Sequence, residues 1–174
     1  MNKTIGLLLL LIVLVSCKGK TKKVVVGLDK NDEKALKIDS YTFSELAPLL
    51  SKNDGKTYVV NFWATWCAPC VKELPAFEKL LVEYTAKNVE VILVSLDFSS
   101  QIKTKLLPFI ERNKLQSKVV LLDDPNQDEW IPKINSKWSG AIPATLIYNA
   151  QKRKFYERSF DYNELETEVQ KFLN

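Results

Sequence analysis

Two cysteines join a predicted strand to a predicted helix in the run Thr57-Tyr58-Val59-Val60-Asn61-Phe62-Trp63-Ala64-Thr65-Trp66-Cys67-Ala68-Pro69-Cys70. Residues 57–63 are mostly β-branched or aromatic, which is typical of a buried strand. Beyond Cys70, apolar residues recur at the spacing of one helix face, at Val71, Leu74, Phe77, Leu81 and Tyr84. The sequence therefore predicts that the cysteine pair lies where the strand ends and the helix begins.

This position gives the first cysteine a distinct chemistry. The free N–H groups and the dipole at a helix N-terminus favour an anion, and the thiolate is the reactive form of cysteine. We therefore expect Cys67 to be the exposed, attacking thiol. Cys70 would be the buried thiol that resolves the mixed disulfide. The pattern predicts redox chemistry on thiols.

A zinc site and a static disulfide are the alternatives for such a pair. A closed zinc site needs four nitrogen or sulfur ligands, whereas the chain has three cysteines and no histidine. The third cysteine, Cys17, lies far from the pair in sequence. We therefore predict no metal and no cofactor. A structural disulfide that closes so short a loop would constrain the unfolded chain little.

The segment Trp66-Cys67-Ala68-Pro69-Cys70 follows a strand that ends in Phe62-Trp63. In this it resembles the active site of the thioredoxin superfamily. The residues that follow, Val71-Lys72-Glu73-Leu74-Pro75, are similar to those of the membrane-anchored TlpA-like branch. The resemblance covers roughly residues 36–173. It implies an α/β fold with a central mixed sheet, helices on both faces, and an inserted helix–strand element between Asp97 and Pro143.

The resemblance also implies roles for other residues. The stretch 139–145 is similar to the loop that carries a cis-proline and faces the disulfide. Pro143 would be that proline, and the backbone of Ile142 would pair with the substrate, while Trp66 would form an apolar surface beside the thiol. Thioredoxins often have an aspartate that moves a proton where this chain has Asn61. Glu73 is the candidate to replace it, unless it is simply a solvated helix residue.

The N-terminus predicts a lipid anchor. Residues 5–15 form an uncharged apolar run that fits a signal peptide and ends in Leu14-Val15-Ser16-Cys17, which resembles a lipoprotein cleavage box. We expect residues 1–16 to be removed and Cys17 to be lipidated. Residues 17–35 would form a tether, and residues 36–174 the domain. The alternative is an ordinary signal peptide in which Cys17 is incidental.

The charge distribution gives no sign of nucleic-acid binding. The formal charge of +4 comes from residues 1–35, which hold seven lysines and three acidic residues, while the rest of the chain is balanced. We therefore predict no nucleic-acid partner.

Periodicity and capping signals predict the remaining elements. A capping box at Thr42 begins a helix that reaches about Leu50, and a terminal helix begins at Asp161. A further helix carries Ile102, Leu106, Phe109 and Ile110. Strands are expected at 90–96, 119–122, 144–148 and 154–156, with an extra edge strand at 24–26.

Taken with the resemblance, these features predict an extracytoplasmic thiol–disulfide oxidoreductase anchored by lipid to a bacterial membrane. It would reduce protein disulfides, for example in cytochrome c maturation, and receive electrons from a membrane donor. No histidine lies between the cysteines, so one donor that would stabilise the thiolate, and with it the reduced form, is missing. This favours a reductase over an oxidase. The alternatives are a disulfide oxidase or isomerase and an anchored, non-catalytic binding module. A peroxidase is disfavoured because the Pro-x-x-x-Thr-x-x-Cys pattern is missing.

Overall fold

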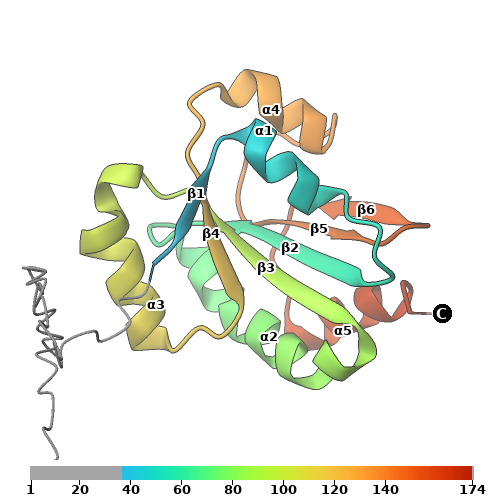
Figure 1. The fold of residues 1–174 in the computed structure, drawn as a ribbon. Helices are drawn as coiled ribbons and strands as arrows, with labels where there is room; N and C mark the ends of the chain where they lie inside the picture. Colours follow the sequence, from blue (N-terminus) through green and yellow to red (C-terminus); the bar gives the residue numbers. More distant parts are fainter. Residues whose placement is uncertain (1–36, 174) are drawn as a thin grey trace, which may run out of the picture. The chain divides into compact units, whose positions relative to one another are not determined.

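A computed structural model describes residues 37–173 of the chain. Its centre is a six-stranded mixed sheet in the order β1-β4-β3-β2-β5-β6 (Figure 1). The strands are β1 (Asp39–Tyr41), β2 (Thr57–Trp63), β3 (Val89–Ser95), β4 (Lys118–Leu122), β5 (Ala144–Tyr148) and β6 (Arg153–Tyr156). Strands β1 to β4 pair in parallel, whereas β5 runs antiparallel to both β2 and β6.

Strand β2 is buried over its whole length, which agrees with its β-branched and aromatic composition. Successive side chains of a strand point to opposite faces of the sheet. Val59 and Trp63 therefore pack in one hydrophobic core, and Tyr58, Val60 and Phe62 pack in the other. Asn61 shares the face of Val59 and Trp63.

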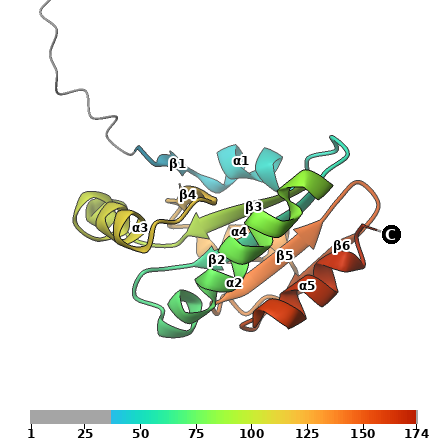
Figure 2. The same ribbon diagram turned by 90° about the horizontal axis from the view of Figure 1, so that it is seen from below.

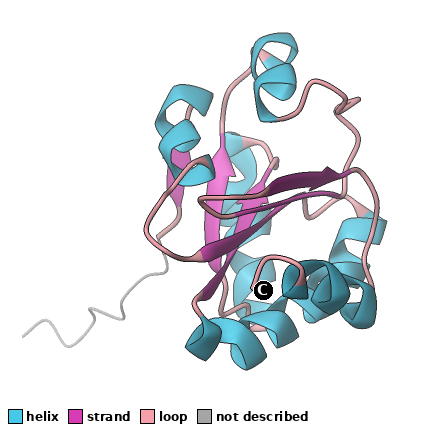
Figure 3. Cartoon of the chain, turned by 90° about the vertical axis from the view of Figure 1, so that its right-hand side faces the viewer, coloured by secondary structure: helices cyan, strands magenta, loops and turns pink. Residues whose placement is uncertain are grey.

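Helices cover both faces of the sheet (Figures 2 and 3). One core contains side chains from α2 (Ala68–Tyr84), α3 (Leu107–Asn113) and α5 (Tyr162–Gln170), and the other contains side chains from α1 (Phe43–Leu46) and α4 (Gln127–Ile134). The short 3-10 helices η1 (Ala47–Leu50), η2 (Thr85–Lys87) and η3 (Ser99–Gln101) and the π-helix η4 (Ile102–Leu106) extend or connect them. This arrangement confirms the predicted α/β fold with a mixed sheet between helices.

Within the described residues, the predicted strands are present with small shifts at their ends. The helix expected to reach about Leu50 is α-helical only over Phe43–Leu46 and continues as the 3-10 helix η1. Both capping boxes form, at Thr42 with Glu45 and at Asp161 with Glu164. The stretch from Asp97 to Pro143 supplies β4 together with α3 and α4, which is more helix than the single inserted helix that was expected.

Two elements were not predicted individually. Strand β1 has three residues and no apolar alternation, so its extended form depends on its pairing with β4. Helix α4 is short and contains Pro132, and it is placed by Trp130 and Ile134, which pack in the core.

The predicted signal peptide (1–16), the tether (17–35), the lipidated Cys17 and the strand at 24–26 lie outside the described residues. Within residues 37–173, every helix is too short or too polar to cross a bilayer.

Candidate active site

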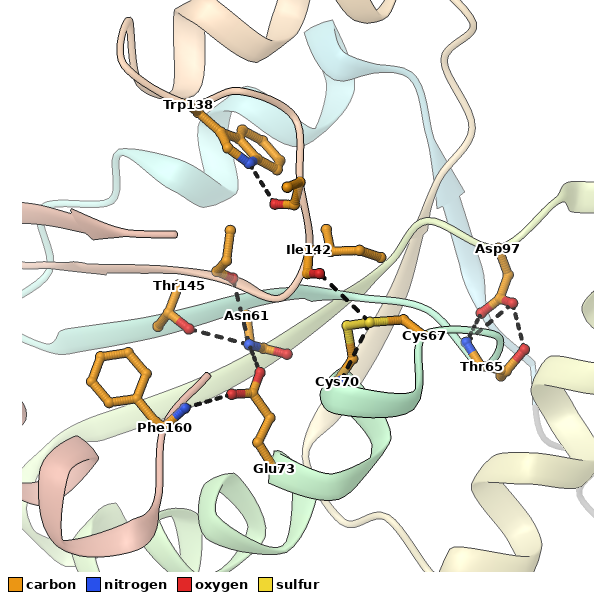
Figure 4. The surroundings of a disulfide bond; sticks show 12 residues. Asn61, Thr65, Cys67, Cys70, Glu73, Asp97, Trp138, Ile142, Thr145 and Phe160 are labelled. Atoms are coloured by element: carbon orange, nitrogen blue, oxygen red, sulfur yellow. Dashed lines mark hydrogen bonds between the residues drawn. A yellow bond between two sulfur atoms is a disulfide. The ribbon is translucent and has the colours of Figure 1, made fainter. Parts of the chain in front are cut away.

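The two cysteines form a disulfide at the start of α2, with an S–S distance of 1.98 Å (Figure 4). Cys67 is the N-cap of α2, and the backbone N–H of Cys70 donates to its sulfur at 3.3 Å. Cys67 therefore lies at a helix N-terminus, as predicted. Such an N–H group also stabilises a thiolate at the same place.

The exposure of Cys67 differs from the prediction. We expected an exposed thiol, but Cys67 is 6% exposed and Cys70 is 0% exposed. The loop before β5 lies against Cys67, and the Ile142 carbonyl oxygen is 3.7 Å from its sulfur. Cys67 is more exposed than Cys70, which agrees with its role as the attacking thiol. In the oxidised protein, however, little of Cys67 is exposed to solvent.

The loop opposite the disulfide has the geometry that the resemblance implied. The Ile142–Pro143 peptide is cis, Pro143 is buried, and Ile142 is half-buried. Trp138 Nε1 donates to the Ala141 carbonyl at 2.8 Å, which holds the loop on the side of the disulfide (Figure 4). Trp66, the residue before Cys67, is 56% exposed, and its role as an apolar surface beside the thiol stays a prediction.

A buried carboxylate holds the turn that precedes Cys67. Asp97 follows β3, and one of its oxygens accepts the Thr65 hydroxyl at 2.6 Å (Figure 4). Its other oxygen accepts the Thr65 backbone N–H at 3.0 Å and the Ser95 hydroxyl at 2.8 Å. These bonds fasten the turn to the end of the neighbouring strand.

We expect Asp97→Asn to destabilise the fold by about 2 kcal/mol, because an amide places N–H groups against donors that need an acceptor. Urea unfolding of the oxidised protein measures this loss. Thr65→Val removes one of the bonds and keeps the backbone one, so its loss should be smaller. Equal stability of Asp97→Asn and the parent chain would contradict the role of the carboxylate in holding the turn.

Glu73 is also buried, at 4% exposed, and so is not the solvated helix residue that was the alternative. One carboxylate oxygen accepts the Asn61 side-chain N–H at 2.8 Å, and the other accepts the Phe160 backbone N–H at 2.8 Å. Glu73 lies one turn after Cys70 in α2, so its carboxylate belongs to the surroundings of the disulfide (Figure 4).

Burial raises the pKa of Glu73 to about 7, since desolvation disfavours the charged form. The bonds from Phe160 and Asn61 and the charge of Arg158 oppose this rise. A carboxyl group with a pKa near neutrality can both accept and return a proton.

Three features of the site were not predicted: the Asp97 contacts, the Phe160 N–H on Glu73, and the Asn61–Glu73 bond. Apart from the Ser95–Asp97 bond, each joins residues that are twelve or more positions apart, and no local pattern signals them. Among residues 37–173, no cluster of His, Cys, Asp or Glu is arranged to hold a metal ion.

A redox-active pair that follows the central strand of a mixed sheet and faces a cis-proline defines a thioredoxin-like protein. Within that class the chain belongs to the AhpC/TSA family, whose model matches residues 34–153. A solved thiol:disulfide interchange protein of the thioredoxin family from Chlorobium tepidum shares the fold. Its TM-score is 0.54 at 21% identity, over 74% of this chain and 85% of that one.

Curated relatives match parts of the chain. Thiol-disulfide oxidoreductase ResA of Oceanobacillus iheyensis is 52% identical over 48 residues, which cover 28% of this chain and 25% of that protein. Sporulation thiol-disulfide oxidoreductase A of Bacillus subtilis is 36% identical over 69 residues, 40% of this chain and 42% of that protein. The chain thus spans less than half the length of these two relatives.

Proposed function

We propose that this chain is a thiol–disulfide oxidoreductase that reduces disulfides in extracytoplasmic proteins, with cytochrome c maturation as one setting. The observation that carries the proposal is the Cys67–Cys70 disulfide at the N-terminus of α2, opposite Ile142 and Pro143. The names of the curated relatives support the same chemistry.

The reaction proceeds through two exchanges at sulfur. The Cys67 thiolate attacks a substrate disulfide, forms a mixed disulfide, and releases the first substrate thiolate. Cys70 gives up its proton and attacks Cys67, which restores the disulfide and releases the second substrate thiolate. The substrate gains two electrons and the protein loses two, so a membrane dithiol donor must reduce the pair again.

Each neighbouring residue has a part in this scheme. The Cys70 N–H stabilises the Cys67 thiolate, and Glu73 receives the proton from Cys70. The Ile142 backbone would pair with the substrate strand, and Trp66 would cover its apolar side. Because reduction uses a dithiol donor, the scheme needs no cofactor.

We expect the reduction potential to lie nearer about −270 mV than about −120 mV, the values typical of a thioredoxin and of a strong periplasmic oxidant. Equilibration of the full chain with glutathione measures it. A potential near the second value would overturn the reductase proposal and favour an oxidase or isomerase. If the pair neither reduced protein disulfides nor oxidised protein thiols, the protein would instead be a binding module.

We also propose that Cys17 is lipidated and holds the protein on a bacterial membrane outside the cytoplasm, facing the periplasm, since residues 5–17 have the pattern of a lipoprotein signal. Cys17→Ala should release the protein from the membrane fraction or leave the precursor uncleaved. Mass spectrometry of the mature N-terminus checks this, with Ser16→Ala as the control that keeps the lipidated cysteine. An unlipidated, fully soluble protein with a different N-terminus would exclude the anchor.

A further inference from the structure

The side-chain oxygen of Asn61 is a buried acceptor without a donor. Asn61 lies in the middle of β2 and is 0% exposed, and its Oδ1 has no hydrogen-bond partner among the described residues. Buried polar groups are nearly always hydrogen-bonded, so an exception needs a physical reason. Trp63 Nε1 is a buried donor two residues along the strand, but within residues 37–173 it also lacks a partner and therefore does not satisfy this oxygen.

The orientation of the amide is fixed by its nitrogen. Asn61 Nδ2 donates to Glu73 Oε1 at 2.8 Å, to Thr145 Oγ1 at 3.1 Å and to the Ala144 carbonyl at 3.4 Å. The Ala144 carbonyl can only accept, and an ionised Glu73 can only accept as well. Turning the amide over would put its oxygen against the Ala144 carbonyl in either protonation state of Glu73, so the oxygen points the other way.

That other direction leads to the disulfide. Asn61 is on the face of the sheet that α2 covers, and its partner Glu73 lies one turn after Cys70. Figure 4 shows the Asn61 nitrogen turned toward Glu73 and Thr145, while the oxygen is turned toward the side of Cys70. In the oxidised pair the sulfur of Cys70 is bonded to Cys67 and carries no hydrogen.

We propose that Asn61 Oδ1 accepts a hydrogen bond from the Cys70 thiol in the reduced protein. When a dithiol donor reduces the pair, the donor becomes a disulfide and its two electrons break the Cys67–Cys70 bond. One of its protons goes to Cys70, and the other goes to solvent if Cys67 stays a thiolate. The new S–H group is buried, and Asn61 supplies the acceptor that it needs.

The bond would exist in one redox state only. The same amide holds the Glu73 carboxylate through its nitrogen and the Cys70 thiol through its oxygen, so it sets the proton donor and the proton acceptor of the resolving step beside each other. Asn61 carries no proton itself. This inference rests on the proposed function, because it assigns a role in the reduced form of the same pair.

The S–H stretching band in the infrared tests the bond directly. The variant Cys17→Ser with Cys67→Ala leaves Cys70 as the only thiol of the full chain. We expect its band at lower frequency than that of an alkanethiol dissolved in an alkane, and we expect Asn61→Leu to shift the band to higher frequency. Thr145→Val is the matched control: it removes a partner of the amide nitrogen, leaves the oxygen in place, and should not move the band.

A Cys70 band at the frequency of the free alkanethiol would overturn the proposal, and this comparison needs no substitution at Asn61. A hydrogen-bonded band that Asn61→Leu left unmoved would overturn it as well, since another acceptor would then serve. The measurement uses no substrate, so a failure of the proposed reductase activity would not change its result.

Discussion

Replacing Cys70 with serine is expected to convert the mixed disulfide from a passing intermediate into a stable product. Cys67 keeps its place as the N-cap of α2 and can still attack a substrate disulfide. A serine hydroxyl cannot displace the substrate from Cys67, so turnover should fall to the uncatalysed rate. Non-reducing electrophoresis and mass spectrometry, after incubation with a protein that has an accessible disulfide, would detect the covalent complex.

The control is the opposite substitution. Cys67→Ser should also abolish turnover, but it should trap no complex, because Cys70 is 0% exposed and cannot reach a substrate. Complexes formed by Cys67→Ser and not by Cys70→Ser would reverse the assignment of the attacking and resolving thiols. Partners captured by Cys70→Ser in cells would identify the substrate class.

The second large effect is expected from Glu73→Gln, which keeps the shape of the side chain and removes its titration. We expect the resolving step to slow by on the order of 10²-fold at neutral pH, the usual contribution of a positioned proton acceptor. Burial raises the pKa of Glu73 to about 7. Above that pH the carboxylate is ionised and can accept the proton of Cys70, and below it the group is already protonated.

The rate of resolution in the parent protein should therefore rise as the pH increases through about 7. In Glu73→Gln this pH-dependent rise should be absent. Rapid-mixing measurements of mixed-disulfide decay from about pH 5 to 9 would follow it. Glu78→Gln is the control on the same helix, because Glu78 bonds to the backbone of Gln116 and Ser117 two turns from Cys70. Unchanged rates in Glu73→Gln at every pH would mean that Glu73 has no part in the chemistry.

The elements that the sequence predicted well are those with local signals. Strand β2 agrees with its composition from end to end, and the helices that begin after Thr42 and Asp161 have the capping boxes that their spacing indicates. The position of the cysteine pair followed from the change of periodicity between strand and helix. The roles of Cys67, Cys70, Glu73 and Trp66 remain predictions until the variants are made.

From the sequence alone followed the redox pair and the strands and helices that have local signals, but not β1 or α4, because local signals depend on neighbouring residues. Only the tertiary structure decided the environment of that pair. The Phe160 N–H reaches Glu73 across 87 positions in the chain, and Asp97 reaches Thr65 across 32. Such contacts depend on how helices pack on the sheet, and no local pattern encodes that packing. Burial then raises the pKa of Glu73 to about 7, and the packing leaves the Asn61 oxygen without a donor among residues 37–173.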